Sequence, residues 1–172
     1  SAASDVYKRQ SLFHSVSAFC NAGIDLLGVR GAYSSLTSYA YDPLINLVII
    51  LLIVIGGIGF LTWDDIYRNR HHISRYRMQS KVILSYSLVL IFIPAILFFF
   101  LEFQDIPAGK RILVSLFQSV TTRTAGFNTA DLSSMRESGQ LLMILLMLVG
   151  GSPGSTAGGI KTTTLAVLIS CA

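Results

Sequence analysis

Two runs of twenty residues without a charged side chain most strongly limit how this chain can fold. They cover Leu44–Trp63 and Val82–Leu101. A helix of twenty residues is about 30 Å long, which matches the hydrocarbon core of a bilayer. Asp42 and Pro43 precede the first run as a candidate N-cap and first helical residue. Pro94 lies inside the second run and predicts a kink, which membrane helices tolerate. We therefore expect two membrane-spanning helices.

The composition agrees with a lipid environment. Hydrophobic residues make up 52% of the 172 residues and charged residues 13%, whereas a soluble domain carries about 25% charged residues. The net charge of +4 could indicate a nucleic-acid partner, but its excess lies in one short segment. Residues 64–81 hold five basic and two acidic side chains. The positive-inside rule places this segment in the cytoplasm, and we expect no nucleic-acid binding.

A third apolar region is interrupted halfway. Leu141–Val149 is nine residues long, and residues 150–161, which contain five glycines and a proline, follow it. Such a segment cannot continue a regular helix, and apolar sequence resumes only at Leu165. The pattern predicts a broken membrane helix, whose irregular backbone must be buried in protein or line a water-filled path. In the first apolar run, Gly56, Gly57 and Gly59 favour close helix packing.

An internal repeat organises the chain. Residues 11–16 (SLFHSV) match residues 115–120 (SLFQSV) at five of six positions, and each copy leads into an Ala-Gly pair, at 22–23 and 125–126. The offset between the copies is 104 residues at the start and 103 at the glycine. Each copy predicts a short amphipathic helix and a Gly-containing turn, followed by a spanning or broken helix.

A short helix followed by an extended Gly-containing loop is typical of a re-entrant pore loop. An ion that leaves water needs oxygen atoms in place of its hydration shell, and backbone carbonyls can supply them. Glycine gives the backbone freedom that this arrangement requires. We therefore predict an ion filter formed by main-chain carbonyls, with two candidate strands: Cys20, Asn21, Ala22 and Gly23, and Arg123, Thr124, Ala125 and Gly126.

Three motifs in order resemble the Trk/Ktr/HKT superfamily of potassium transporters, and the nearest likeness is to the bacterial Ktr-type (TrkH family) membrane subunit. Residues 17–25 (SAFCNAGID) resemble its second pore loop and residues 119–129 (SVTTRTAGFNT) its third. Residues 150–164 are similar to the intramembrane gating loop of its third repeat. The resemblance covers nearly everything from Ser11 onward.

The resemblance implies an all-α integral membrane fold, in which four helix–pore-loop–helix repeats surround one pore as in potassium channels. This chain would be a fragment: the pore loop and second helix of one repeat (11–69), a cytoplasmic linker (70–81) and the next repeat (82–172). Residues 1–10 fit nothing that follows, and we expect them to be a non-native leader. A gating loop would obstruct the pore below the filter, and its residues would be Gly150, Gly151, Ser152, Pro153, Gly154, Ser155, Thr156, Ala157, Gly158, Gly159 and Lys161.

The resemblance also implies an activity and partners. The function would be potassium uptake by a multi-pass protein of the cell membrane, with K⁺ bound through filter carbonyls and Na⁺ as a coupling or activating ion. The full-length protein would be a homodimer surrounded by lipid, and a cytoplasmic nucleotide-binding ring would meet it near Arg68–Lys81. Cys20 and Ile24 stand where the family more often has Asn and Phe, and we expect these changes to affect packing.

Four residues allow two interpretations each. Arg123 either pairs with an acid or tunes the field around an ion. Asp25 and Asn128, which follow the two glycines, either attract cations or cap the next turn. Lys161, a charge at membrane depth, either acts in transport or marks the restart of a helix.

Two other functions fit the sequence less well. Residues 154–162 nearly match the phosphate-binding loop of NTPases, but Ile160 is an extra residue and that loop should follow a β-strand. A membrane scaffold without transport would leave the repeat unexplained. The sequence contains no catalytic constellation, so we do not expect an enzyme.

Overall fold

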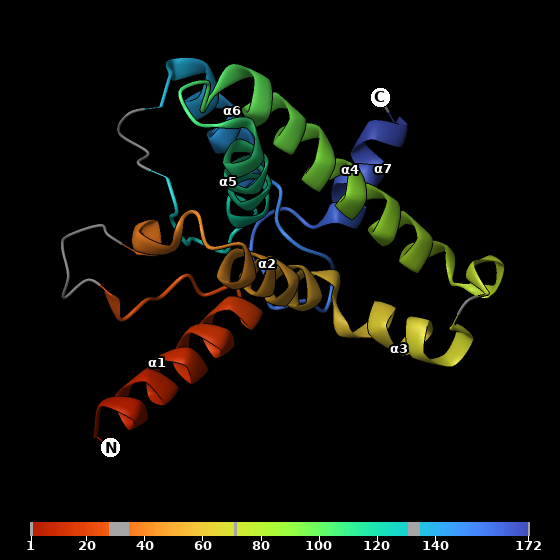
Figure 1. Ribbon diagram of the computed structural model, residues 1–172. Helices are drawn as coiled ribbons and strands as arrows, with labels where there is room; N and C mark the ends of the chain where they lie inside the picture. The colour runs from red at the N-terminus through yellow and green to blue at the C-terminus, as the bar shows by residue number, and fades with distance from the viewer. Residues whose placement is uncertain (1, 28–34, 71, 131–134, 172) are drawn as a thin grey trace.

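The computed structural model describes residues 2–27, 35–70, 72–130 and 135–171, and this part of the chain is built from helices (Figure 1). Its only β-type pairing is an isolated bridge between Val149 and Ile160. The prediction of an all-α chain is confirmed. The helices are α1 (Ala2–Phe19), α2 (Pro43–Ile58), α3 (Phe60–Asn69), α4 (Met78–Leu101), α5 (Ala108–Thr121), α6 (Glu137–Leu148) and α7 (Thr162–Cys171), with short 3₁₀ turns η2 (Thr37–Tyr39) and η3 (Ile73–Arg75).

Helix α4 contains the second uncharged run and is 24 residues long. Among the described helices it alone is long and apolar enough by itself to cross a membrane. Pro94 lies inside it without ending it. The carbonyl of Ile91, one turn earlier, accepts a hydrogen bond of 2.6 Å from the Ser119 hydroxyl of α5. This bond helps to fix α5 along the middle of α4.

The first uncharged run is not one continuous helix, and that prediction is wrong. Helix α2 ends at Ile58, α3 begins at Phe60, and the two helices are bent by 95°. Gly59 between them has φ +93°, a region that favours glycine. The start of α2 is as predicted, because the Asp42 carboxylate accepts hydrogen bonds from the backbone N–H groups of Leu44 and Ile45, and Pro43 is the first helical residue.

The two copies of the repeated helix differ in length and surroundings. Helix α5 has 14 residues and packs along α4. Helix α1 has 18 residues, so the expectation of a short helix in this copy is wrong. Residues 2–10, which the sequence set apart as a leader, are continuous with the rest of α1 and extend away from the other helices (Figure 1).

The third apolar region is broken as predicted. Helix α6 ends at Leu148, α7 begins at Thr162, and the Gly-rich segment between them is not helical. The β-bridge between Val149 and Ile160 draws the two ends of this segment together. The segment thus leaves α6 and returns to nearly the same place before α7 starts.

The main core lies where the repeated helices meet α2 and α4. It includes Ile53 of α2, Ile91 of α4 and Phe117 of α5, together with Ala125 and Phe127 on either side of Gly126. A smaller cluster joins α4 to α6 and contains Phe98, Met135, Met143 and Leu146. The core therefore surrounds the second Gly-containing loop and fixes its backbone.

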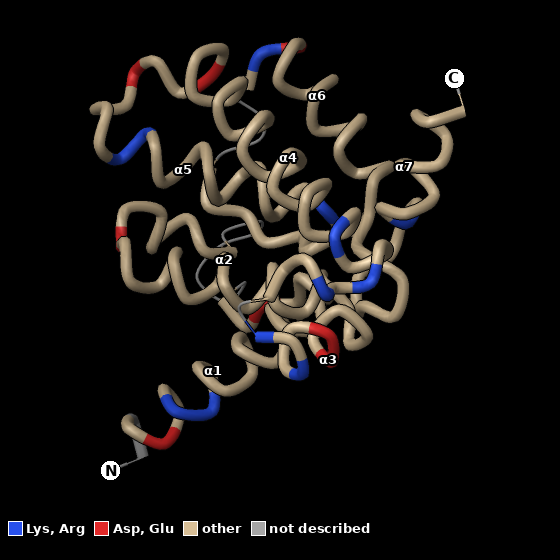
Figure 2. Tube along the Cα trace, turned by 90° about the vertical axis from the view of Figure 1, so that its right-hand side faces the viewer, with Lys and Arg blue, Asp and Glu red and all other residues tan. Residues whose placement is uncertain are grey.

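The segment with excess positive charge connects α3 to α4. Its basic residues gather around these two elements (Figure 2) and are Arg68, Arg70, Arg75, Arg77 and Lys81. The buried carboxylate of Asp65 organises this connection, because it accepts hydrogen bonds from the Asn69 amide (2.6 Å) and from the Arg77 backbone N–H (2.8 Å). The Tyr76 hydroxyl donates to the carbonyl of Arg70.

Candidate functional site

The two Gly-containing loops, 103 residues apart in sequence, touch each other at their glycines. A Cβ atom built on Gly23 would lie 2.9 Å from the Cα of Gly126 and 2.2 Å from the carbonyl oxygen of Ala125. A Cβ atom built on Gly126 would lie 3.4 Å from the Cα of Gly23. The structure thus brings the two candidate filter strands together, and only glycine fits at position 23.

The repeat is also visible in the backbone conformation. Gly23 and Gly126 have φ of +66° and +80°, and two residues before each of them Asn21 and Thr124 have φ of +51° and +74°. Non-glycine residues rarely adopt such values, so a matching pair at the same offset indicates a shared loop geometry. The two copies therefore share a fold as well as a sequence motif.

A hydroxyl group from the preceding helix fixes each loop in the same way. The Ser17 hydroxyl donates to the carbonyl of Ile24, and the Thr121 hydroxyl donates to the carbonyl of Phe127, both at 2.7 Å. In each copy the accepting carbonyl belongs to the residue after the glycine. Neither residue was predicted from the sequence, although both copies carry a hydroxyl side chain at the same place in the repeat.

The remaining candidate filter residues differ in exposure between the copies. In the first loop Cys20 and Ala22 are exposed. In the second loop Ala125 is fully buried and Thr124 is half-buried. The backbone N–H of Ala22 bonds to the carbonyl of Ser17 (2.9 Å), and that of Ala125 bonds to the carbonyl of Thr121 (3.0 Å). Asn21, by contrast, is buried, so the two loops have similar hydrogen bonds but bury different positions.

The structure decides some of the open interpretations. No acidic side chain among the described residues forms an ion pair with Arg123, so the expected pairing is wrong. The Asp25 carboxylate accepts a hydrogen bond of 3.0 Å from the backbone N–H of Leu27, which favours the turn-capping role. Asn128 uses its main chain, accepting from the backbone N–H of Leu36 at 2.9 Å. The ammonium group of Lys161 donates to the Ala157 carbonyl at 2.6 Å and braces the Gly-rich segment from within.

The Gly-rich segment docks on the break between α2 and α3. The backbone N–H groups of Ser152 and Thr156 donate to the carbonyls of Gly57 (3.0 Å) and Gly56 (3.3 Å), near the end of α2. The backbone N–H of Phe60, at the start of α3, donates to the carbonyl of Gly154 (3.1 Å). The segment therefore satisfies backbone groups that a broken helix leaves without intrahelical partners.

Thr156 joins this segment directly to the first Gly-containing loop. Its hydroxyl donates to the carbonyl of Phe19, the last residue of α1, at 3.0 Å. The same oxygen accepts a hydrogen bond of 2.9 Å from the Asn21 side-chain amide. Gly56 permits this approach, because a Cβ atom there would lie 1.9 Å from the Phe19 oxygen. The candidate gating loop and the candidate filter are thus in contact.

This arrangement lacks the context of a nucleotide-binding loop. The near match at residues 154–162 follows helix α6 rather than a β-strand, and its backbone groups bond to α2, α3 and its own ends. Its N–H groups at Thr156, Ile160 and Thr162 are therefore occupied. The arrangement can present main-chain carbonyls and small side chains where the two loops meet, which suits the replacement of water around a cation.

The chain is similar to known cation transport proteins. The family model described as TrkH, cation transport protein, matches residues 3–172. The chain is 41% identical over 164 residues to the potassium/sodium uptake protein NtpJ of Enterococcus hirae, covering 92% of this chain and 35% of that protein. It is 40% identical over 165 residues to the Ktr system potassium uptake protein B of Bacillus subtilis (92% and 36% covered). It is 37% identical over 164 residues to the protein of the same name from Vibrio alginolyticus (91% and 35% covered). The chain spans about a third of the length of these curated relatives.

Proposed function

Because this chain belongs to the TrkH family of cation transport proteins, we propose that it forms part of a potassium pathway across the cell membrane. The names of the relatives, a potassium/sodium uptake protein and a Ktr system potassium uptake protein, support potassium as the transported ion. The first of these names also supports Na⁺ as a second transported, coupling or activating ion.

The observation that carries the proposal is the contact between Gly23 and Gly126. Two loops with the same backbone conformation, each following a repeated helix, meet at glycines whose missing side chains allow the main chains to approach. Main-chain carbonyls of residues 20–23 and 123–126 would replace the hydration shell of the ion. In an arrangement of four repeats these loops supply two of the four filter strands.

We assign the Gly-rich segment, residues 150–161, to control of the pathway. Its hydrogen bonds to α2, α3 and Phe19 support a docked position directly against the first loop. Because these hydrogen bonds are few, only a small set of contacts would have to break for the segment to move. Undocking would open the path, and docking would obstruct it.

The membrane arrangement follows from the same elements. Helix α4 would span the bilayer, α2 would enter it, and the charged part of α3 together with the basic connection between α3 and α4 would face the cytoplasm. Multi-pass insertion of the full-length protein is part of this proposal. Exposed apolar side chains along α4, such as Leu88, Phe92 and Ile96, would face lipid or neighbouring helices.

Further subunits are also proposed. The word "system" in the names of the Ktr relatives supports an assembly with other components. We propose a second copy of the full-length protein and a cytoplasmic nucleotide-binding ring, which would meet the basic residues between Arg68 and Lys81. Basic side chains at this surface suit an acidic partner face.

Growth at low potassium tests the transport proposal. The full-length parent and its Gly126→Ser variant are expressed in cells that lack their own potassium uptake. We expect the parent to restore growth and the variant to weaken it or to shift ion preference, since φ of +80° disfavours a side chain at this position. A parent that reaches the membrane without restoring growth would contradict potassium uptake and favour the scaffold. Full rescue of growth by the variant would indicate that other residues form the filter.

A further inference from the structure

One residue near the end of each repeated helix holds its Gly-containing loop on both sides of the glycine. In the first copy, the carbonyl of Ser17 accepts a hydrogen bond of 2.9 Å from the backbone N–H of Ala22, the residue before the glycine. The Ser17 hydroxyl donates to the carbonyl of Ile24, the residue after the glycine, at 2.7 Å and accepts from its N–H at 3.0 Å. Ser17 therefore clamps the loop with its main chain and its side chain together.

The second copy repeats this clamp. The carbonyl of Thr121 accepts from the backbone N–H of Ala125 at 3.0 Å, and its hydroxyl donates to the carbonyl of Phe127 at 2.7 Å. Ser17 and Thr121 are only 5% and 4% exposed, so bulk water does not compete for these hydrogen bonds. The two loops lie in different surroundings, and a clamp common to both therefore belongs to the repeat itself.

The clamp divides the carbonyl groups of each loop into two kinds. The carbonyls of residues 24 and 127 each accept a hydrogen bond from a hydroxyl. No other described residue donates a hydrogen bond to the carbonyls of residues 20–23 and 123–126. Carbonyls without a donor are the ones that can replace water around a cation. The row of free carbonyls thus ends at Gly23 in one loop and at Gly126 in the other.

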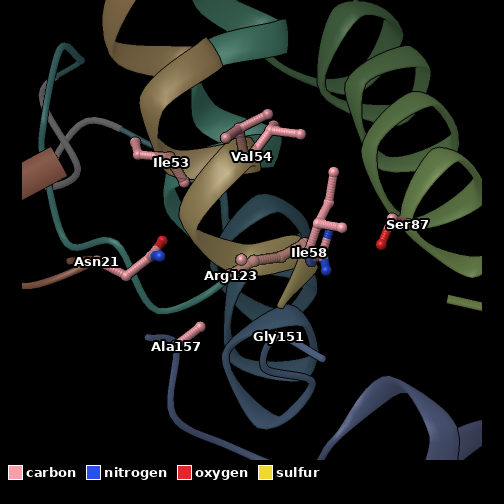
Figure 3. Close-up of a pocket in the computed structure, with 10 residues that line it drawn as sticks. Asn21, Ile53, Val54, Ile58, Ser87, Arg123, Gly151 and Ala157 are labelled. Atoms are coloured by element: carbon pink, nitrogen blue, oxygen red, sulfur yellow. The ribbon is translucent and has the colours of Figure 1, made fainter. Parts of the chain in front are cut away.

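The two rows of free carbonyls converge. A Cβ atom built on Gly23 would lie 2.9 Å from the Cα of Gly126. Asn21 and Arg123, one from each row, also line the same small cavity beside α2 (Figure 3). A shift of either loop would therefore change the distances between the two rows.

Release of the clamp would alter the oxygens that an ion meets. A filter distinguishes cations by the number and the arrangement of these oxygens. A loop released on one side of its glycine would turn easily, because glycine has few steric restrictions. The carbonyl of residue 24 or 127 would also lose its donor and become available to the ion. Loss of the hydroxyl should therefore change ion preference as well as stability.

We propose that Ser17 and Thr121 are positioning residues of the ion filter, which set ion preference by ending the rows of free carbonyls at Gly23 and Gly126. This proposal rests on the transport function proposed above and extends it to side chains outside the filter strands. It assigns the task to the hydroxyl group of each residue rather than to the size of the side chain.

Two substitutions of Thr121 separate the hydroxyl from the shape of the side chain. Thr121→Val keeps the shape without the hydroxyl, and Thr121→Ser keeps the hydroxyl. The full-length parent and variants are expressed at matched membrane amounts in cells that lack their own potassium uptake, and the ratio of rubidium to sodium uptake is measured. We expect the ratio of the Val variant to fall about tenfold, equivalent to about 1.4 kcal/mol, and the Ser variant to keep the parental ratio.

Ser119→Ala is the matched control on the same helix. The Ser119 hydroxyl is also buried, but it donates to the carbonyl of Ile91 in α4 rather than to the loop. This variant should melt at a lower temperature with an unchanged ion ratio. An equal fall of the ratio in Ser119→Ala would overturn the proposal, because it would show that any loss of stability in α5 changes ion preference.

The remaining outcomes distinguish this proposal from the transport function. A Thr121→Val variant with the parental ratio would overturn the positioning role and leave the transport function intact. A parent that reaches the membrane and takes up neither ion would overturn both. If Thr121→Val does not reach the membrane, Ser17→Ala is measured in its place with Ser17→Thr as its control, and a parental ratio in Ser17→Ala would again overturn the positioning role.

Discussion

Gly23 lies so close to Gly126 that a Cβ atom at position 23 would be 2.9 Å from the Cα of its counterpart. The reverse distance is longer, since a Cβ atom at position 126 would be 3.4 Å from the Cα of Gly23. The two glycines occupy equivalent places in the repeat, yet they tolerate a side chain to different degrees. This asymmetry leads to the first prediction.

Substitution of each glycine by alanine should give unequal defects. Gly23→Ala places its methyl group 2.2 Å from the Ala125 carbonyl oxygen, so the loops must move apart, and we expect loss of potassium uptake. Gly126→Ala has more room but keeps a strained φ, which costs roughly 1–2 kcal/mol, and we expect reduced uptake with altered ion preference. Rubidium and sodium uptake by the full-length variants measures both effects. Equal behaviour of the two variants would argue against the described contact.

Thr156 should control how firmly the Gly-rich segment is docked. Thr156→Val preserves shape but removes the hydroxyl that bonds to Phe19 and Asn21, at a cost of about 1–3 kcal/mol for the groups left unpaired. We expect a lower melting temperature and a higher rate of ion uptake. Thr156→Ser keeps the hydroxyl and serves as the control. Identical uptake by the Val and Ser variants would show that this contact does not restrain the segment.

Asp65 should make the α3–α4 connection sensitive to acid. Burial raises the pKa of this carboxyl, but hydrogen bonds from Ser80, the Arg77 backbone and Asn69, with the charge of Arg77, outweigh burial and lower it. The charged Asp65 carboxylate therefore stabilises the fold fully above the ordinary pKa of aspartate, about 4. This stabilisation is lost as the pH falls through the lower pKa that Asp65 has in the folded state.

Asp65→Asn should accordingly lower the melting temperature at neutral pH. Its melting temperature should also decrease less between neutral and acidic pH than that of the parent. The neighbouring Asp64→Asn variant is the matched control, because Asp64 is only half-buried and contributes one surface ion pair to Arg68. Melting curves of the full-length protein between neutral and acidic pH distinguish the two. Equal stability of these variants would contradict the organising role of Asp65.

The glycines at the end of α2 should respond differently to alanine. Gly59→Ala forces a side chain onto φ +93° with its Cβ 2.6 Å from the Pro153 carbonyl, so the helix break and the docked segment should both be disturbed. Gly57→Ala meets no atom within 4 Å and improves helix propensity by about 1 kcal/mol. We expect a large fall in melting temperature for the first variant and little change for the second. A stable Gly59→Ala variant would contradict the hinge.

Much of this architecture could be predicted from the sequence, because it depends on local patterns. The Asp42–Pro43 helix start, the apolar run from Val82 and the break after Leu148 each have a clear compositional cause. The break at Gly59 could not be predicted in this way. A glycine at this position is compatible with close helix packing and with a bend. The bend occurs because Ser152 and Thr156, about 95 residues away, donate hydrogen bonds to the carbonyls at the end of α2.

The candidate site shows the same division. The repeat identified Gly23 and Gly126, but their contact depends on tertiary packing around Ala125 and Phe127. An acidic partner was one of the two interpretations of Arg123, since a charged side chain near a membrane usually needs one. The structure instead places Arg123 in the lining of a small cavity to which Asn21 and Ser87 also contribute, and nothing in the spacing of these three residues indicated a shared cavity.

The most direct test of the central claim is to locate the ion. Thallium ions mimic potassium and scatter anomalously, so crystals of the full-length protein grown in thallium would mark cation sites. We expect an anomalous peak beside the main chain of residues 20–23 and 123–126, where the two glycines meet, and its loss or displacement in the Gly126→Ser variant. Thallium bound elsewhere along the pathway, with none at these loops, would contradict the assignment of Gly23 and Gly126 to the filter.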